Sequence, residues 1–290
     1  MNPTHPTIPV PPPTPPAPAA PPVPATPFAP PTPFAPAAPA APPQDLPTAY
    51  ADIDLGNNAQ RLPLLLCLDI SSSMAGEPIR LLNEALALWG REIQEDVGLS
   101  SSVEIALVTF GGPGIGVWQG PRLLEPHATG SPFVTAHQFQ PPQLSASGVT
   151  LLTEAVETGM HLVAHRKAEL RGSGLQYYRP QICLVTDGLP TDCHGMATDT
   201  WRRLVPQLTT QQAAKRFRFY AFGIGGISER GQQVLRELAP KYHATLQGFP
   251  FRDLLQTMSA SASAEQQGAE EETFEQLFHR FKTQRSAWDA

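Results

Sequence analysis

Apolar residues recur along the chain in two alternating patterns, one typical of buried strands and the other of amphipathic helices. Residues 62–70 are almost continuously apolar, as expected of a strand in a parallel sheet that helices cover on both faces. Residues 78–96 then place apolar side chains at helical spacing, which predicts a helix with one buried face. Together the two segments predict the first strand and the first helix of an α/β domain.

The same alternation continues to about residue 260. Further strands are predicted at 103–110, 117–124, 182–186, 217–224 and 244–246, and further helices at 150–170, 198–215, 228–238 and 251–259. Strands that alternate with helices of this length form doubly wound sheets, because each helical crossover returns the chain parallel to the preceding strand. We therefore expect an α/β domain over residues 58–262, with a doubly wound, mostly parallel six-stranded sheet and helices on both faces, as in Rossmann-like folds.

Residues 1–49 show neither pattern. This segment holds most of the chain's 34 prolines and has no lysine, arginine, aspartate or glutamate before Asp45. Such a composition buries too little apolar surface to offset the entropy of ordering, so it predicts a disordered tail with polyproline-II character. A repeated Thr-Pro-Phe-Ala-Pro motif contains Phe28 and Phe34. The tail is therefore either a solvated spacer or a docking segment that offers two phenylalanines to a partner.

The C-terminal part differs again. Residues 263–272 are small and acidic, which indicates a linker, and residues 273–288 are expected to form an amphipathic helix. Four apolar side chains recur in this helix at i, i+3, i+4 and i+7, namely Phe274, Leu277, Phe278 and Phe281. Such a stripe either covers the chain's own domain or binds a groove on a partner protein.

Charge and cysteine content exclude several functions. The formal net charge is −6 without a basic cluster, which argues against nucleic-acid or anionic-membrane partners. The 3 cysteines form no Cys-x-x-Cys pair, as is typical of free thiols in a reducing compartment. The N-terminus lacks the features of an export signal, and no stretch approaches the roughly 20 apolar residues that cross a bilayer. We therefore expect a cytoplasmic protein.

Five oxygen-bearing side chains follow the predicted strands or begin a predicted helix. Asp69, Ser71 and Ser73 come at the end of the first strand, Asp187 ends the fourth, and Thr150 begins a helix. Taken singly, each has an ordinary explanation, since aspartate caps helices and serine runs form loops. In open α/β sheets, however, ligands bind outside the carboxyl ends of strands, where the strand order reverses. Together the five residues predict a shared site.

Two carboxylates and three hydroxyls suit a small, hard cation. Mg²⁺ takes oxygen ligands in near-octahedral geometry and usually keeps some of its waters. Neither histidine nor cysteine is in the set, which disfavours zinc. The residues therefore predict a Mg²⁺ site, with Mn²⁺ or Ca²⁺ as alternatives.

These residues resemble the metal-ion-dependent adhesion site of von Willebrand factor A domains. The pattern Asp69-x-Ser71-x-Ser73 is similar to its first motif, Ser147-Gly148-Val149-Thr150 to the segment that supplies its threonine, and Asp187 to its distal aspartate. The resemblance covers roughly residues 61–260. Residues 139–148, 186–192 and 222–225 are most similar to the bacterial tellurium-resistance, TerY-like branch.

The resemblance implies a binding function. In that family Ser71, Ser73 and Thr150 would contact the metal, Asp69 and Asp187 would act directly or through water, and a partner's aspartate or glutamate would take an exchangeable position. It also implies a non-catalytic adaptor in a bacterial stress-response or defence system, with a PP2C-type phosphatase or a protein kinase as partner.

Two alternatives remain open. A Mg²⁺-dependent phosphohydrolase would also place an aspartate after the first strand, but it needs an acid two positions later, where this chain has Ser71. Neither a Walker A loop nor a Gly-x-Ser-x-Gly motif is present. The second alternative is a linker protein that acts through its proline-rich tail and its C-terminal helix.

Overall fold

The computed structural model describes residues 57–125, 128, 130–249 and 251–288, with side chains up to residue 280. All of them belong to the second of two compact units, Leu46–Ala290. Phe28 and Phe34 lie outside the described residues, so the docking hypothesis for the tail stays a prediction.

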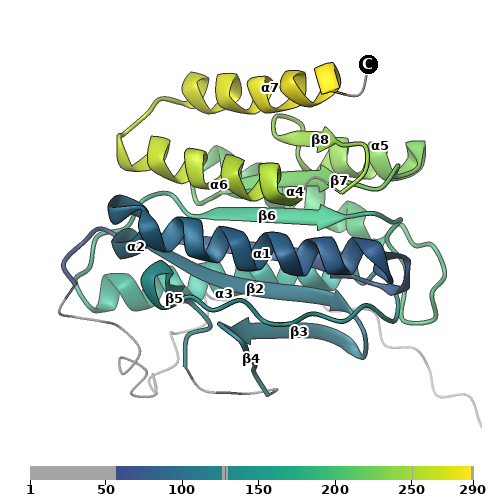
Figure 1. Ribbon diagram of the computed structural model, residues 1–290, viewed down its shortest axis with the longest axis horizontal. Helices are drawn as coiled ribbons and strands as arrows, with labels where there is room; N and C mark the ends of the chain where they lie inside the picture. Colours follow the sequence, from purple (N-terminus) through teal and green to yellow (C-terminus); the bar gives the residue numbers. More distant parts are fainter. Residues whose placement is uncertain (1–56, 126–127, 129, 250, 289–290) are drawn as a thin grey trace, which may run out of the picture. The chain divides into compact units, whose positions relative to one another are not determined.

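A mostly parallel sheet forms the centre of this unit (Figure 1). Its strands lie in the order β4-β3-β2-β1-β6-β7-β8, and β5 pairs with β2. The strands are β1 (Leu62–Ile70), β2 (Val103–Gly111), β3 (Gly114–Gln119), β4 (Arg122–Leu123), β5 (Val134–Thr135), β6 (Gln181–Thr186), β7 (Arg218–Gly223) and β8 (His243–Thr245). The predicted fold class is confirmed. The strand predicted at 117–124 is divided by a turn at residues 120–121 into β3 and the two-residue β4. The structure adds β5, whose two residues are too few to leave an alternating pattern in the sequence.

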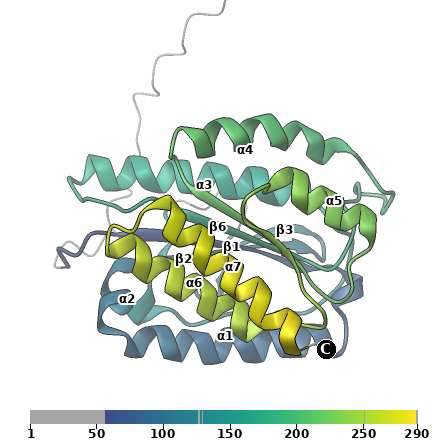
Figure 2. The same cartoon turned by 90° about the horizontal axis from the view of Figure 1, so that it is seen from above.

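Helices cover both faces of the sheet, as Figure 2 shows. One face carries α1 (Glu77–Glu95), α2 (Val97–Ser102), α6 (Phe251–Gln266) and α7 (Glu271–Trp288), and the other carries α3 (Leu152–Gly172), α4 (Leu204–Ala213) and α5 (Glu229–Leu238). Among the described residues there are also three short 3₁₀ helices, η2 (Ser72–Met74), η3 (Ala136–Gln138) and η4 (Thr200–Arg203). No helix in the described part of the chain combines the length and the apolar character that crossing a membrane requires.

The central strand β1 is apolar because both of its faces are buried. Leu64, Leu66 and Leu68 belong to the core beneath α1 and α6, whereas Leu65 and Cys67 belong to the core beneath α3. Helix α3 approaches closely at Gly159, where an added Cβ would lie 2.9 Å from Leu65. Close packing on both faces fixes the position of Asp69 at the end of the strand.

The C-terminal helices are longer than predicted. Helix α6 continues to Gln266 instead of ending near residue 259, and α7 begins at Glu271, so only residues 267–270 separate them. Small residues allow this extension, because Ser261 is completely buried and its hydroxyl lies 2.6 Å from the Tyr220 hydroxyl. The predicted linker at 263–272 is therefore largely helical.

Helix α7 uses its aromatic stripe to cover its own domain. Phe274 and Phe278 are 1% and 3% exposed, and the Phe278 ring lies 5.8 Å from Tyr242 and 5.7 Å from Phe222, measured between ring centroids. The Arg218 guanidinium lies over the Phe274 ring. The prediction that Phe274 and Phe278 bind a partner is wrong, because the same periodicity serves an internal contact.

The rest of the stripe is less constrained by the structure. Leu277 is half-buried, and Phe281 lies in α7 with its side chain outside the described part. Their proposed contacts with a partner stay predictions.

Candidate metal centre

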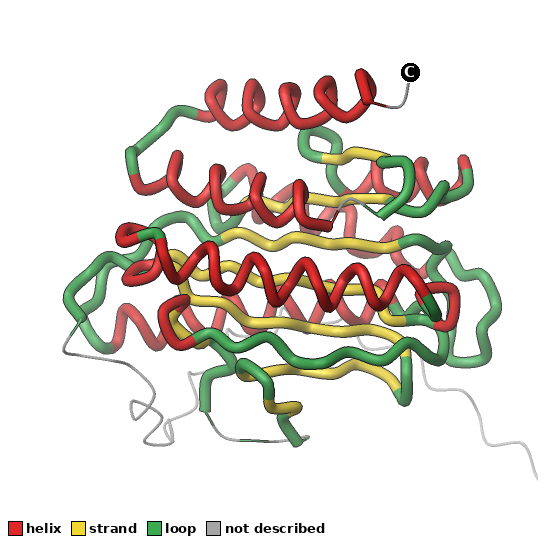
Figure 3. The backbone as a smooth tube through the Cα atoms, in the orientation of Figure 1, coloured by secondary structure: helices red, strands yellow, loops and turns green. Residues whose placement is uncertain are grey.

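The parallel strands β1 and β6 end at one edge of the sheet, on the right in Figure 1, where Figure 3 shows loops following the strands. The candidate ligands lie at the ends of these strands or in the segments that follow them and precede α3. Strands β1 and β6 are parallel neighbours, with Leu68 opposite Val185. This register brings the end of β1 beside the end of β6, and the Thr186 hydroxyl donates a 2.6 Å hydrogen bond to Asp69 Oδ2. The prediction that Asp69 and Asp187 lie at the same edge is confirmed.

Asp69 is a buried carboxylate with few compensating charges. It is 1% exposed, and its Oδ1 accepts a 2.8 Å hydrogen bond from the Ser71 backbone N–H. The pKa of Asp69 is raised to about 6, mainly by burial and to a smaller extent by the negative charge of Asp187, while hydrogen bonds from Ser71 and Thr186 oppose the rise. None of the described groups that shift this pKa is cationic. A buried carboxylate of this kind is stabilised by a bound cation.

A chain of hydroxyls connects this carboxylate region to the second aspartate. Ser71 Oγ lies 3.1 Å from Ser73 Oγ, and Ser73 Oγ donates a 2.7 Å hydrogen bond to Asp187 Oδ1. Asp187 is half-buried, and burial raises its pKa. Four of the five predicted ligands therefore form one continuous cluster of oxygen atoms.

Thr150 reaches the same segment from the beginning of α3. A Cβ added to Gly188 would lie 3.4 Å from Thr150 Oγ1, so the hydroxyl lies beside the residue that follows Asp187. The backbone of Thr150 is held by Thr191, whose hydroxyl accepts from the Thr150 N–H and whose N–H donates to the Thr150 carbonyl, each at 2.9 Å. Among the described side chains, the Thr150 hydroxyl makes no hydrogen bond with the other four candidate ligands. Thr150 is thus the peripheral member of the set.

Two glycines let the supporting loops pack backbone against backbone. Gly148 has φ +75°, and a Cβ there would lie 2.3 Å from the Gly112 carbonyl oxygen. The Gly148 carbonyl accepts hydrogen bonds from both the backbone N–H and the hydroxyl of Ser72. The Ser147 N–H donates to the Ile70 carbonyl at 2.8 Å. The segment before Thr150 therefore holds the serine loop directly.

Sequence reasoning missed the two threonines that support the site. Thr186 positions the Asp69 carboxylate, and Thr191 positions the backbone of Thr150. A hydroxyl directly before the strand-ending Asp187 was a usable signal for Thr186, because a polar side chain in a buried strand requires a partner. Thr191 left no local signal, since its contact is with a residue distant in sequence.

The set of donors fits a hard divalent cation. In the described part of the chain, no three or more histidine, cysteine, aspartate or glutamate side chains gather as a metal site. The cluster here combines two carboxylates with neutral hydroxyls. Mg²⁺ is commonly held by one or two carboxylates together with neutral oxygens and water. The residues present therefore fit Mg²⁺ better than zinc.

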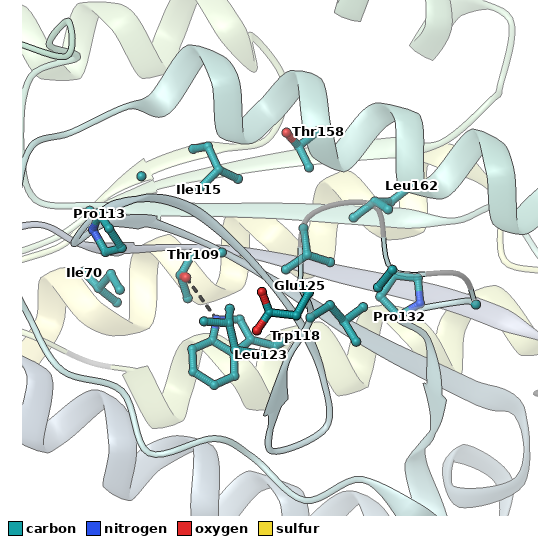
Figure 4. Close-up of a pocket in the computed structure, with 17 residues that line it drawn as sticks. Ile70, Thr109, Pro113, Ile115, Trp118, Leu123, Glu125, Pro132, Thr158 and Leu162 are labelled. Carbon is teal, nitrogen blue, oxygen red and sulfur yellow. Dashed lines mark hydrogen bonds between the residues drawn. The ribbon is translucent and has the colours of Figure 1, made fainter.

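A separate hollow lies beside this cluster, between β3 and α3 (Figure 4). Its volume is about 640 Å³, and Ile70 and Gly111 line the end nearest the loops described above. None of the five candidate ligands lines it. Its walls are mostly apolar, and the Trp118 indole N–H donates to the Thr109 hydroxyl at 3.0 Å. The hollow thus differs in chemistry from the oxygen cluster.

The cysteines show no sign of a reactive centre. Cys67 and Cys183 are buried, and burial raises the pKa of both thiols. Cys193 is exposed. None of the three belongs to the oxygen cluster.

Comparisons with known proteins gave similarity in structure alone. No protein-family profile and no curated protein sequence matches this chain.

Among solved structures, the chain is similar to the vWF domain of the type V pili tip protein Mfa5 from Porphyromonas gingivalis, with a TM-score of 0.41 and 12% identity over 73% of this chain and 97% of that domain. It is also similar to the pilus adhesin SpaC from Lactobacillus rhamnosus GG, with a TM-score of 0.47 and 15% identity over 70% of this chain and 30% of that one. Proximal thread matrix protein 1 from the mussel byssus gives a TM-score of 0.42 and 16% identity over 68% of this chain and 46% of that one. The chain thus spans less than half of SpaC and of the mussel protein. At these TM-scores the similarities carry no argument about function, and the fold class is established by the strand order itself.

Proposed function

We propose that this chain is an interaction module of the von Willebrand factor A type, which binds a partner's carboxylate through a divalent cation, Mg²⁺ in the first place. One observation carries the proposal. Buried Asp69 and the chain Ser71–Ser73–Asp187 form one oxygen cluster where β1 and β6 end side by side. This is the position at which open α/β sheets bind ligands.

The five candidate ligands would bind the ion in two ways, as neutral hydroxyls and as negatively charged carboxylates. Ser71, Ser73 and Thr150 supply neutral oxygens, and Asp69 and Asp187 supply negative charge directly or through water. The bound ion supplies an electrophilic position at which a carboxylate from a partner can replace water. With only two carboxylates in the set, the ion keeps its attraction for a third. Thr186 and the Ser71 N–H hold the Asp69 carboxylate in one orientation.

The geometry favours binding over catalysis. In a phosphohydrolase of the kind considered above, position 71 would carry a general acid or base. Here it carries the Ser71 hydroxyl, which is 2% exposed and contacts Ser73. A hydroxyl has no titration near neutral pH and cannot replace such an acid. We therefore propose no enzymatic activity.

The partner class follows from the resemblance to the TerY-like branch. On that basis the module acts as an adaptor in a bacterial stress-response or defence system, with a PP2C-type phosphatase or a protein kinase as its partner. Capture from native cells with and without chelator tests this, and recovery of such an enzyme only with Mg²⁺ present is the expected result.

The metal site itself is tested by calorimetric titration of the full chain with Mg²⁺, Mn²⁺ and Ca²⁺. We expect one ion per chain, and affinity at least about tenfold weaker in Asp69→Asn and Asp187→Asn, since each loses a charged ligand. Asp96→Asn is the matched control, because Asp96 caps α2 through the Leu99 N–H and asparagine caps helices equally well. Unchanged affinity in both site variants would refute the proposal.

A further inference from the structure

The loops around the candidate metal centre contain no lysine or arginine. Their charged side chains are Asp187 and Asp192, and Asp69 directly precedes the first of these loops. With the strand residues that flank them, these loops are residues 70–76, 111–117, 145–151, 187–197 and 224–228. No guanidinium or ammonium in them can pair with an acid of a partner.

This charge pattern restricts what the loops can bind. A divalent ion would attract one carboxylate, and further acids on the partner that reach these loops would meet negative or neutral side chains. Arg230, two residues beyond them, is paired with Asp199 at 3.2 Å. Like charges brought together at an interface weaken binding. The loops therefore disfavour a partner that carries further acidic residues beside the one that binds the ion.

An exposed methionine in the same loops indicates which uncharged neighbours fit. Met196 is 67% exposed, and it is one of three large hydrophobic side chains that the described residues leave exposed, beside Val97 and Leu123. Methionine is flexible and polarisable, and it adapts to apolar surfaces of varied shape. Because Met196 lies in a loop that contacts the Thr150 segment, it gives these loops one exposed apolar side chain.

The loop that carries Met196 is held in one conformation. Asp192 Oδ1 accepts hydrogen bonds from the backbone N–H groups of His194 and Met196, both at 2.9 Å. The Asp192 N–H also donates to the Met196 carbonyl at 2.8 Å. Asp192 is thus a loop residue, as its sequence context suggests, and its carboxylate is committed to this turn. A contact made by Met196 costs little conformational entropy in the backbone.

The same loop packs against the segment that supplies Thr150. Thr191 exchanges two hydrogen bonds with Thr150. A Cβ on Gly195 would lie 3.4 Å from a methyl carbon of Val149. Met196 is therefore carried by a turn that rests directly on the candidate ligand segment.

From these observations we infer that the loops around the candidate metal centre recognise a single carboxylate flanked by apolar residues. In this complex Met196 contacts the apolar flank. The inference rests on the proposed function, because the carboxylate needs the ion. Asp192 is a positioning residue that keeps Met196 in place.

The test uses the full chain in saturating Mg²⁺ and fluorescent peptides with one central aspartate. The two residues on each side of it are leucine, serine, lysine or glutamate. We expect leucine flanks to bind at least about fivefold tighter than serine flanks, since burying an apolar side chain on Met196 stabilises the complex. Glutamate flanks should bind weakest. A peptide with asparagine in the centre should not bind.

Two variants assign the preference to Met196. Met196→Ser should remove most of the leucine preference while leaving the affinity for Mg²⁺ and for serine-flanked peptide unchanged, and Met196→Leu should retain it. Val97→Ser is the matched control, because Val97 is 86% exposed on α2, at the opposite edge of the sheet. It should leave every peptide affinity unchanged.

The outcomes separate the two proposals. If no aspartate peptide binds in Mg²⁺, the proposed function itself fails. If aspartate peptides bind in a Mg²⁺-dependent way with equal affinity, or lysine flanks bind best, the proposed function stands and the inference about Met196 is overturned. An unchanged leucine preference in Met196→Ser overturns it as well.

Discussion

Buried charges occur at both edges of the sheet, but only one edge neutralises them within the protein. At the edge where β1 and β2 begin, Arg166 donates two hydrogen bonds to Glu104, at 2.7 and 2.8 Å, and a third to Glu169 at 2.9 Å. Arg61 lies 3.4 Å from Glu104. All four side chains are buried. At the other edge Asp69 and Asp187 have hydroxyl partners and no cation among the described groups that shift the pKa of Asp69.

The difference distinguishes a structural cluster from a candidate site. A buried acid with arginine partners satisfies its charge inside the fold. A buried acid that has only hydroxyl partners keeps a charge that a ligand can satisfy. Strongly perturbed acids in such surroundings mark candidate functional sites. The two edges therefore respond differently to substitution.

The largest expected effect comes from Arg166→Met, which leaves Glu104 and Glu169 buried without their main partner. We expect the free energy of unfolding to fall by about 3–5 kcal/mol, the usual consequence of breaking a buried ion pair. Urea denaturation followed by circular dichroism measures it. A loss below about 1 kcal/mol would show that the network contributes little.

The opposite sign is expected for Asp69→Asn in the absence of metal. Folding raises the pKa of Asp69 from 3.8 to about 6, so its stabilising contribution is complete below pH 3.8 and is lost as the pH rises through 6. Asparagine is neutral at all pH values and can still bond with Ser71 and Thr186. At pH 8 in EDTA the variant should gain about 1–3 kcal/mol in free energy of unfolding, and at pH 3.5 it should gain nothing. Equal effects at the two pH values would contradict a charge-based origin.

Metal affinity should decrease as the pH falls through 6. Protonated Asp69 is a poor ligand, so proton and Mg²⁺ compete for the same carboxylate. Titration of the wild-type chain at pH 7.5 and pH 5 should give an affinity at least about tenfold lower at the acidic pH. The thermal midpoint should rise with Mg²⁺ at pH 7.5 in the wild type and stay constant in Asp187→Asn. A pH-independent affinity would place the ion elsewhere.

The smallest effect is expected from an exposed ion pair. Arg80 and Glu84 pair across one turn of α1 at 2.6 Å, and both side chains are more than half exposed. Water and salt screen such a pair. Arg80→Ala should leave both the free energy of unfolding and the Mg²⁺ affinity unchanged within error. A clear loss of stability or of Mg²⁺ affinity would show that exposed charges also contribute. The effects at the two edges of the sheet could then not be assigned to burial.

Sequence patterns predicted the strands and helices that have a fully buried face, and the polar residues at which these strands end. The strand that became β1 was correctly bounded, because its apolar run ends where the oxygen ligands begin. The joint position of Asp69 and Asp187 followed from the rule that parallel strands end at one edge. Metal binding itself stays a prediction, since oxygen geometry alone is consistent with several hard cations.

Contacts between residues far apart in the sequence could not be predicted from these patterns. Periodicity shows that the stripe containing Phe274 and Phe278 must be covered, but it does not show by what, and the cover proved to be the chain's own Tyr242 and Phe222. The extension of α6 depends on Ser261 meeting Tyr220, a contact between residues 41 positions apart. Thr186 and Thr191 act in the same way, through partners that only the folded chain brings near.

Helix α7 determines where this protein can be shortened for experiments. A chain cut after residue 262, where periodic patterns place the end of the domain, would lose Phe274 and Phe278 and expose Tyr220, Phe222 and Tyr242 to water. Apolar surface of this extent promotes self-association. A loss of ligand binding in such a fragment would then report aggregation, so fragments made for binding studies should keep at least residues 57–280.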